Sequence, residues 1–122
     1  MQLVDSSGWI EFFTGGPLAD EYARHLKEPN LVVTPTIVLY EVYKKIKRDR
    51  TEEEALSAVS LMNRTKVVDL TESTALFAAD LSIKHSLPMA DAIVYATALE
   101  SNCTVVTGDA HFRELDRVQF IE

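Results

Sequence analysis

Four acidic residues stand at positions from which a folded chain can bring their side chains together: Asp5, Glu41, Asp91 and Asp109. Asp5 and Asp109 each follow an apolar run, whereas Glu41 and Asp91 belong to apolar segments. A carboxylate beside core-forming residues is costly to desolvate unless something compensates, and a divalent cation is the obvious candidate. Hard oxygen ligands select Mg²⁺ or Mn²⁺ over softer metals. Metal-dependent chemistry on a phosphate is therefore the leading hypothesis.

Each acid also has an ordinary structural explanation. Asp5 and Asp109 can cap the segments that follow them, and Asp91 suits the first turn of a helix. Glu41 and Lys45 form an i,i+4 pair in the favourable order. A cluster is harder to explain in this way, because two carboxylates 4 Å apart repel by ~4 kcal/mol at an effective dielectric near 20. Several such contacts require a cation or shared protons.

Short apolar runs alternate with helical segments along the chain, bounded by glycine, proline and capping residues. Ser6, Ser7 and Gly8 are expected to form a turn, and the side of the helix from 71 that carries Leu76, Phe77, Leu81 and Ile83 is expected to be buried. The pattern predicts strands over 2–5, 31–33, 66–70, 104–107 and 118–121, and helices over 9–13, 17–26, 36–48, 51–63, 71–86 and 89–100, with a helical turn over 110–112.

This alternation predicts a single α/β domain over 1–122, with a mainly parallel sheet and helices on both faces. Ligands of such sheets gather beyond the carboxyl ends of the strands. Asp5 and Asp109 follow two of these ends, Asp91 opens a helix, and Glu41 lies in a helix entered from the second strand. The topology therefore allows the four acids to converge.

Charge and composition narrow the classes of protein. The net charge of −7 argues against nonspecific nucleic-acid binding through the whole surface. A local cationic run follows Glu41, and it is expected either to be a solvated helix end or to contact phosphates; its members are Lys44, Lys45, Lys47, Arg48 and Arg50. No apolar run approaches the ~20 residues of a membrane span. No signal peptide is evident, and the single Cys103 agrees with a reducing compartment, so a cytoplasmic location is expected.

Other chemistries find little support. His25, His85 and His111 lack the spacing of a zinc site. His111 lies two residues beyond Asp109 and could face the pocket, but a surface or half-buried position is expected. No phosphate-binding glycine loop or Gly-x-Ser-x-Gly elbow is present. A Mg²⁺-dependent phosphatase of the Asp-x-Asp kind would need an aspartate where Ser7 stands, but it remains an alternative.

In four places the sequence resembles the PIN-domain ribonucleases, and specifically the VapC-type toxins of toxin–antitoxin systems. These places are Val4-Asp5-Ser6-Ser7, Thr36-Ile37-Val38-Leu39-Tyr40-Glu41-Val42, the run from Leu87 to Ala98 around Asp91, and Thr107-Gly108-Asp109-Ala110-His111-Phe112. Their order and spacing cover nearly the whole chain. Tyr40 departs from the pattern, because smaller residues are common beside this glutamate, and it puts the shape of the pocket in doubt.

The resemblance implies a three-layer PIN-like sandwich that acts as an endoribonuclease, with Asp5, Glu41, Asp91 and Asp109 as catalytic and metal-binding acids. Mg²⁺, or Mn²⁺ in its place, would activate the water that cleaves RNA. Ser6 is expected to support the site, Thr107 to orient Asp109, and the cations Lys44, Lys45, Lys47 and Arg48 to guide the RNA. The implied partners are RNA, a VapB-type antitoxin whose tail reaches the acidic pocket, and a second copy in a homodimer. A non-cleaving PIN-like module that binds RNA or protein is the other alternative.

Overall fold

Short parallel strands alternate with helices in the computed structural model, which describes all residues 1–122. The strands are β1 (Gln2–Val4), β2 (Val33–Pro35), β3 (Lys66–Val68), β4 (Thr104–Thr107) and β5 (Val118–Phe120). The helices are α1 (Ser6–Thr14), α2 (Ala19–Leu26), α3 (Thr36–Asp49), α4 (Glu52–Met62), α5 (Glu72–His85) and α6 (Met89–Glu100), with short 3₁₀ helices η1 (Pro29–Leu31) and η2 (Ala110–Phe112).

The strands form two parallel ladders, β1-β4-β5 and β2-β3. A single bridge between Gln2 and Val32 joins them, so the strands run side by side in the order β3-β2-β1-β4-β5. The order reverses at β1, and the gap between β1 and β4 is therefore the switch point at which open α/β sheets bind ligands. The predicted parallel sheet is confirmed, although its hydrogen bonding is divided into two parts.

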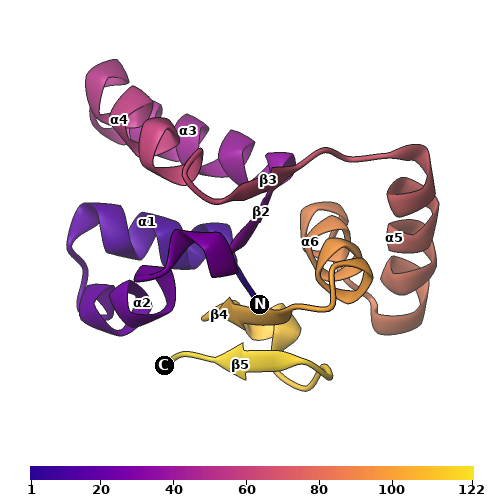
Figure 1. The fold of residues 1–122 in the computed structure, drawn as a ribbon. Helices are drawn as coiled ribbons and strands as arrows, with labels where there is room; N and C mark the ends of the chain where they lie inside the picture. The colour runs from indigo at the N-terminus through magenta and orange to yellow at the C-terminus, as the bar shows by residue number, and fades with distance from the viewer.

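Helices cover both faces of the strands. In Figure 1, α1 and α2 lie on one side, α5 and α6 lie on the other, and the α3–α4 hairpin stands above α1. The predicted α/β sandwich is confirmed. No helix in the structure is both long enough and apolar enough to cross a membrane.

The core joins the central strands to the helices on both faces. Leu3, Val4, Val105 and Val106 are fully buried, because a strand covered on both faces has no solvent side. Most of α6 is buried as well, so Asp91 in its first turn is carried into the interior. Its amino end thereby approaches the ends of β1 and β4.

The predicted turn over Ser6, Ser7 and Gly8 is wrong. These residues are the first turn of α1, which begins directly after Asp5. Gly8 lies in this helix because α1 passes very close to α2 and β1. A Cβ at this position would lie 2.5 Å from the Tyr22 ring and 2.7 Å from Val4 Cγ1. The glycine serves close packing and does not break the chain.

The expected buried side of α5 is also wrong in part. Leu76 is 64% exposed and Ile83 is 83% exposed, whereas Leu81 is buried. Residues seven apart lie on one side of a helix, so Leu76 and Ile83 share the outer side. The buried side instead carries the smaller Thr74 and Ala78.

Element bounds differ from the prediction at a few other places. The strand expected over 31–33 begins at Val33, because Pro29 opens η1 before it. Helix α2 begins at Ala19, two residues after the predicted start, and strand β3 ends at Val68. The capping residue predicted for α4 is confirmed, since the Thr51 hydroxyl accepts a hydrogen bond from the Glu54 backbone N–H at 3.0 Å.

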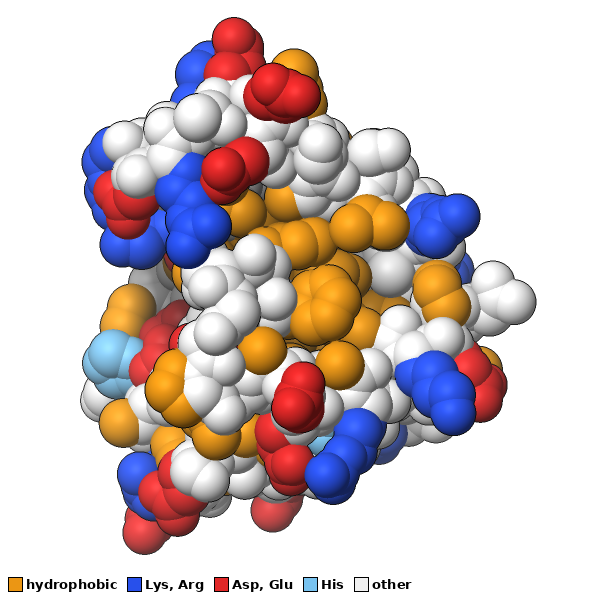
Figure 2. Space-filling view, turned by 90° about the vertical axis from the view of Figure 1, so that its left-hand side faces the viewer, with side chains coloured by type: hydrophobic (Ala, Val, Ile, Leu, Met, Phe, Trp, Pro, Cys, Tyr) orange, Lys and Arg blue, Asp and Glu red, His pale blue; other side chains and the backbone are white.

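A broad apolar hollow separates α1 from the α3–α4 hairpin. It has a volume of about 550 Å³, and its apolar lining comes from Phe13, Ile46, Ala58 and Leu61. Figure 2 shows apolar side chains gathered at the centre of this face, with charged side chains around them. Ile46 and Ala58 belong to the core, whereas Leu61 is 44% exposed at this surface.

We predict that Gly8→Ala destabilises the protein by roughly 1–3 kcal/mol, because the added methyl group has no room beside Tyr22 and Val4. Urea denaturation followed by circular dichroism measures the change. The control is Ser73→Ala at an exposed position of α5, which should alter the free energy of unfolding by less than about 0.5 kcal/mol. An equally stable Gly8→Ala protein would contradict the close packing of α1.

Candidate metal centre and active site

The site begins where β1 and β4 end. Asp5 directly follows β1, and its backbone N–H donates to the Val106 carbonyl of β4 at 3.1 Å. Its side chain is only 3% exposed, although it is ionisable. Burying a carboxylate is costly unless hydrogen bonds or a cation compensate, so the contacts of Asp5 determine what this position can do.

Three donors surround the Asp5 carboxylate. The Ser6 backbone N–H donates to Oδ1 at 2.7 Å, which caps α1, and the Thr107 hydroxyl donates to Oδ2 at 3.0 Å. The Ser7 hydroxyl lies 3.5 Å from Oδ2. Burial raises the pKa of Asp5, and these hydrogen bonds lower it in part. Capping and a role in the site are therefore compatible for Asp5.

Thr107 connects Asp5 to Asp109. While its hydroxyl donates to Asp5, 102 residues away, it accepts a hydrogen bond from the Asp109 backbone N–H at 3.0 Å. Asp109 then caps η2, because its Oδ1 accepts from the His111 backbone N–H at 2.9 Å. Thr107 thus contacts both aspartates, and its orienting role in the site stays a prediction.

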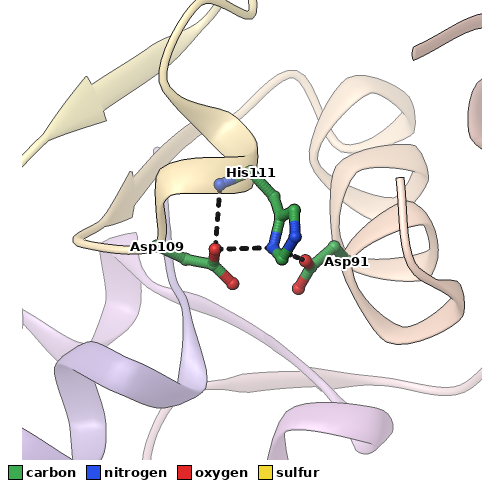
Figure 3. A group of neighbouring side chains, drawn as sticks. All are labelled: Asp91, Asp109 and His111. Atoms are coloured by element: carbon green, nitrogen blue, oxygen red, sulfur yellow. Dashed lines mark hydrogen bonds and ion pairs between the residues drawn. The ribbon is translucent and has the colours of Figure 1, made fainter. Parts of the chain in front are cut away.

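The His111 side chain lies between Asp109 and Asp91. Its Nδ1 lies 2.9 Å from Asp109 Oδ1 and 3.1 Å from Asp91 Oδ2. Figure 3 shows the imidazole between the two carboxylates, with Asp91 at the start of α6. One ligand atom from each of the three side chains lies within 4.8 Å of the others. The structure thus places Asp91, Asp109 and His111 together as a possible metal-binding group.

Sequence reasoning gave His111 little weight, and as expected the residue is 56% exposed. Its ring nevertheless turns inward, because the cap that Asp109 forms on η2 folds the next two residues back toward Asp91. The spacing of two residues from Asp109 was the only available signal.

The charges of the acids act on one another. The pKa of Asp91 is raised from 3.8 to about 7, first by burial, then by the charges of Asp109 and Asp5. Burial also raises the pKa of Glu41, with further contributions from Asp5 and Asp109 and a lowering by a Ser6 hydrogen bond. All four predicted acids are therefore within electrostatic reach of one another, and a cation among them would relieve the repulsion.

Glu41 lies half-buried on α3. Like Asp5, it is not one of the three residues whose ligand atoms come together. The expected pairing of Glu41 with Lys45 is wrong, because Lys45 Nζ binds Asp49 Oδ2 at 2.7 Å. Without a basic partner, Glu41 remains a carboxylate at the edge of the acidic group.

The cationic run at the end of α3 is largely paired with acids of the α3–α4 hairpin. Asp49 also binds Arg48, whereas Lys47 contacts Glu52 and Arg50 contacts Glu54. These pairs are exposed, and exposed ion pairs contribute little to stability. Lys44 has no acidic partner in the structure, and its Nζ lies 3.4 Å from the Tyr40 hydroxyl.

A shallow hollow of about 260 Å³ brings part of the run beside Glu41, and its lining includes Ser6, Lys44, Lys45 and Arg48. Lys47 does not line it. Figure 2 shows Lys and Arg side chains gathered at the level of the α3–α4 hairpin, with acidic side chains below them. A cationic edge thus adjoins the acidic group.

A family model of the PIN domain matches residues 3–118. This range is nearly the whole chain, and the protein therefore belongs to the PIN domain family. No curated protein matches the sequence.

Several solved structures share the fold. A chain of a toxin–antitoxin complex from Klebsiella pneumoniae is 21% identical at a TM-score of 0.82, with 98% of this chain and 96% of that chain covered. VapC20 from Mycobacterium tuberculosis, a toxin that cleaves the sarcin–ricin loop, is 19% identical at a TM-score of 0.80, with 100% and 98% covered. DNA-bound VapBC from Salmonella typhimurium is 15% identical at a TM-score of 0.75, with 99% and 98% covered. At these identities, the likeness establishes the fold.

We predict that Asp91→Asn stabilises the metal-free protein at pH 8. The pKa of Asp91 is about 7 in the folded protein and 3.8 in the unfolded chain. Between these pH values the folded protein binds more protons than the unfolded chain, so its free energy of unfolding falls as the pH rises. Because solvent screens part of the repulsion, we expect a gain on the order of 1–2 kcal/mol at pH 8 and almost none near pH 4.

Urea unfolding in EDTA across this pH range measures the difference. Asp80→Asn, at an exposed position on α5, is the control and should show no comparable gain. A loss of stability in Asp91→Asn at pH 8 would instead assign Asp91 to stabilising the amino end of α6.

Proposed function

We propose that the protein is a Mg²⁺- or Mn²⁺-dependent endoribonuclease, and that it acts as the toxin of a toxin–antitoxin pair. The observation that carries this proposal is the group formed by Asp91, Asp109 and His111, whose ligand atoms lie within 4.8 Å of one another. Thr107 ties Asp5 to the same place. Membership of the PIN domain family supports a nuclease, and the relatives in toxin–antitoxin complexes support the biological role.

The donor set fits a divalent cation. Carboxylate oxygens suit Mg²⁺ and Mn²⁺, and an imidazole nitrogen adds a ligand that first-row transition metals accept readily. The raised pKa of Asp91 indicates negative charge that the protein leaves partly uncompensated. Asp91, Asp109 and His111 would hold the ion, with Asp5 beside them and Glu41 at the edge. When bound, the ion lowers the pKa of water and offsets negative charge on the scissile phosphate.

Neighbouring residues fix the orientation of the acidic side chains. Hydrogen bonds from Ser6 and Thr107 fix the orientation of Asp5, so its carboxylate needs no rearrangement when substrate arrives. Burial and nearby charge raise the pKa of Glu41, and a more basic carboxylate is a better acceptor for a proton of the attacking water. We assign this general-base role to Glu41.

RNA is the proposed substrate. Because RNA is a polyanion, it can approach the acidic group only where cationic side chains offset the repulsion. Lys44, Lys45 and Arg48 line the hollow beside Glu41, where they can contact phosphates. Lys47 packs over Tyr43 and contacts Glu52, so we give it a smaller part than the other three. A cytoplasmic location completes this proposal, since cellular RNA is found there.

Two alternatives make different predictions. A non-cleaving PIN-like module would bind RNA or protein without cutting, but all four acids are retained here. A phosphatase of the Asp-x-Asp kind would need a second carboxylate where the Ser7 hydroxyl lies near Asp5. Incubation with total cellular RNA, with and without EDTA, followed by mapping of the cut ends, separates these alternatives from a nuclease.

The proposed antitoxin has a suitable surface to contact. The hollow between α1 and the α3–α4 hairpin carries Phe13, Ile46 and Leu61, with Arg50 and Glu54 among its charged lining residues. An amphipathic segment of a partner protein suits such a surface. From this place, a tail of the antitoxin would extend toward the acidic group and keep RNA away from it.

We predict that Asp109→Asn reduces metal-dependent RNA cleavage by at least about a hundredfold, because it removes a charge that acts on the transition state. Asparagine also caps helical turns well, so η2 should keep its conformation and the folded state should be preserved. Initial rates on a fluorogenic RNA in Mg²⁺ measure the effect. Asp80→Asn is the matched control and should cleave normally, whereas full activity of Asp109→Asn would refute the assignment.

The proposed homodimer also has a candidate surface. Four large apolar side chains on or beside α5 and α6 are exposed: Leu70, Leu76, Ile83 and Met89, which are 47%, 64%, 83% and 75% exposed. Leu70 and Met89 line a hollow of about 350 Å³ with Ala75, Ala79 and Ile93, and no charged residue lines it. An uncharged face of this kind can meet its own copy without opposing like charges.

We predict that Met89→Glu converts a dimer to a monomer, because it places a charge in this uncharged interface. Glutamate is favoured in the first turn of a helix, so α6 itself should remain stable. Size-exclusion chromatography with light scattering measures the mass. Leu61→Glu, on the other apolar face, is the control and should stay dimeric, and an unchanged mass of Met89→Glu would place the interface elsewhere.

A further inference from the structure

The hollow beside Glu41 contains one exposed aromatic side chain. Tyr40 is 57% exposed, and it is the only aromatic residue among the large apolar side chains that are exposed. It lines the hollow with Glu41 and the three cations Lys44, Lys45 and Arg48. A ring open to solvent between cations combines two features that bind single-stranded nucleic acid, a stacking surface and phosphate contacts.

Helical spacing explains why these side chains share one surface. Residues three and four apart are neighbours on a helix, so Tyr40, Lys44 and Arg48 follow one line on α3, with Glu41 and Lys45 on the adjacent line. Ser6 enters the same hollow from α1, immediately after Asp5. The aromatic ring therefore lies beside the acidic group and close to the scissile phosphate of the proposed substrate.

Lys44 holds the Tyr40 side chain in place. Its Nζ lies 3.4 Å from the Tyr40 hydroxyl and 5.5 Å from the ring centroid. Because Lys44 has no acidic partner here, its ammonium group can contact a phosphate next to the ring without breaking an ion pair. Lys45 and Arg48, by contrast, share Asp49 and must give up part of that contact to bind RNA.

The same helix supplies an internal comparison. Lys47 Nζ lies 3.2 Å from the Tyr43 hydroxyl and 5.3 Å from the Tyr43 ring centroid. This pair has the same spacing and similar geometry, but Tyr43 packs against the core and Lys47 contacts Glu52. Neither residue lines the hollow. Tyr40 therefore differs from Tyr43 in position and exposure, and not in its local contact with lysine.

We propose that Tyr40 is a stacking surface for one unpaired base of the RNA substrate, with Lys44 on the adjacent phosphate. This inference rests on the proposed ribonuclease function and deepens it by assigning a base-binding subsite to the hollow beside Glu41. Stacking tolerates any base, so the subsite selects for unpaired structure more than for sequence. A base within an intact duplex cannot reach the ring.

Fluorescence anisotropy with labelled ten-nucleotide RNAs tests the subsite. All proteins carry Asp109→Asn, so that the RNA is bound in Mg²⁺ without being cut. Tyr40→Ala should weaken binding of single-stranded oligo(U) and oligo(A) by about five- to a hundredfold, as expected for one lost stack. Tyr40→Phe should bind like the parent, because the ring is kept. Binding of the matched duplex should be weak and unaffected by either change.

Two further variants separate stacking from charge and from folding. Tyr43→Ala is the matched control and should leave RNA binding unchanged. Lys44→Ala should reduce the slope of log affinity against log salt concentration by about 0.7, the value for one phosphate contact on a single strand. Tyr40→Ala should keep the slope of the parent, since it removes no charge.

Several results would overturn the subsite. These are equal affinities of Tyr40→Ala and the parent, an equal loss in Tyr40→Phe, an equal loss in Tyr43→Ala, or no RNA binding by the parent. Absence of metal-dependent RNA cleavage by the unaltered protein would contradict the proposed function itself. A protein that cleaves RNA but is indifferent to Tyr40→Ala would keep the function and lose only the subsite.

Discussion

One hydroxyl group fixes the geometry of the acidic site. Thr107 donates to Asp5 and accepts from the backbone of Asp109, so the ends of β1 and β4 are held in register beyond the last ladder hydrogen bonds. The carboxylates at these ends repel: burial raises the pKa of Asp5, and the charge of Asp109 raises it further. Core packing of the two strands and the Thr107 contacts must therefore hold the acids together against their charge. The result is a preorganised place for a cation.

Much of the architecture can be predicted from the sequence, because local signals and tertiary packing agree in most segments. Helix α6 and strand β4 have the predicted bounds, and Thr51 caps α4 as expected. The misses occur where packing overrides local signals. Gly8 resembles a turn residue, but it is required by the nearby Tyr22 ring. Leu76 and Ile83 resemble core residues, but the outer side of α5 carries them.

The candidate site also has features that the sequence predicts and features that depend on the folded protein. Four acids can be selected from the sequence because they follow apolar runs or lie within apolar segments, and the structure places them within mutual electrostatic reach. The orientation of His111 depends on the cap that Asp109 forms, which no residue pattern specifies. The partner of Lys45 was ambiguous as well, since Glu41 and Asp49 both lie four residues from it on the helix. Burial of Glu41 decides between them, and burial is a property of the folded protein.

The divided sheet separates the two halves of the site. Asp5, Asp109 and His111 follow strands of the β1-β4-β5 ladder, whereas Tyr40, Glu41 and Lys44 lie on α3, which leaves the β2-β3 ladder. Only the bridge from Gln2 to Val32 joins the ladders through backbone pairing. Shear between the ladders would therefore change the gap between the acids and the cationic helix while leaving each half intact. The width of the proposed active site is thus governed mainly by side-chain packing across this seam.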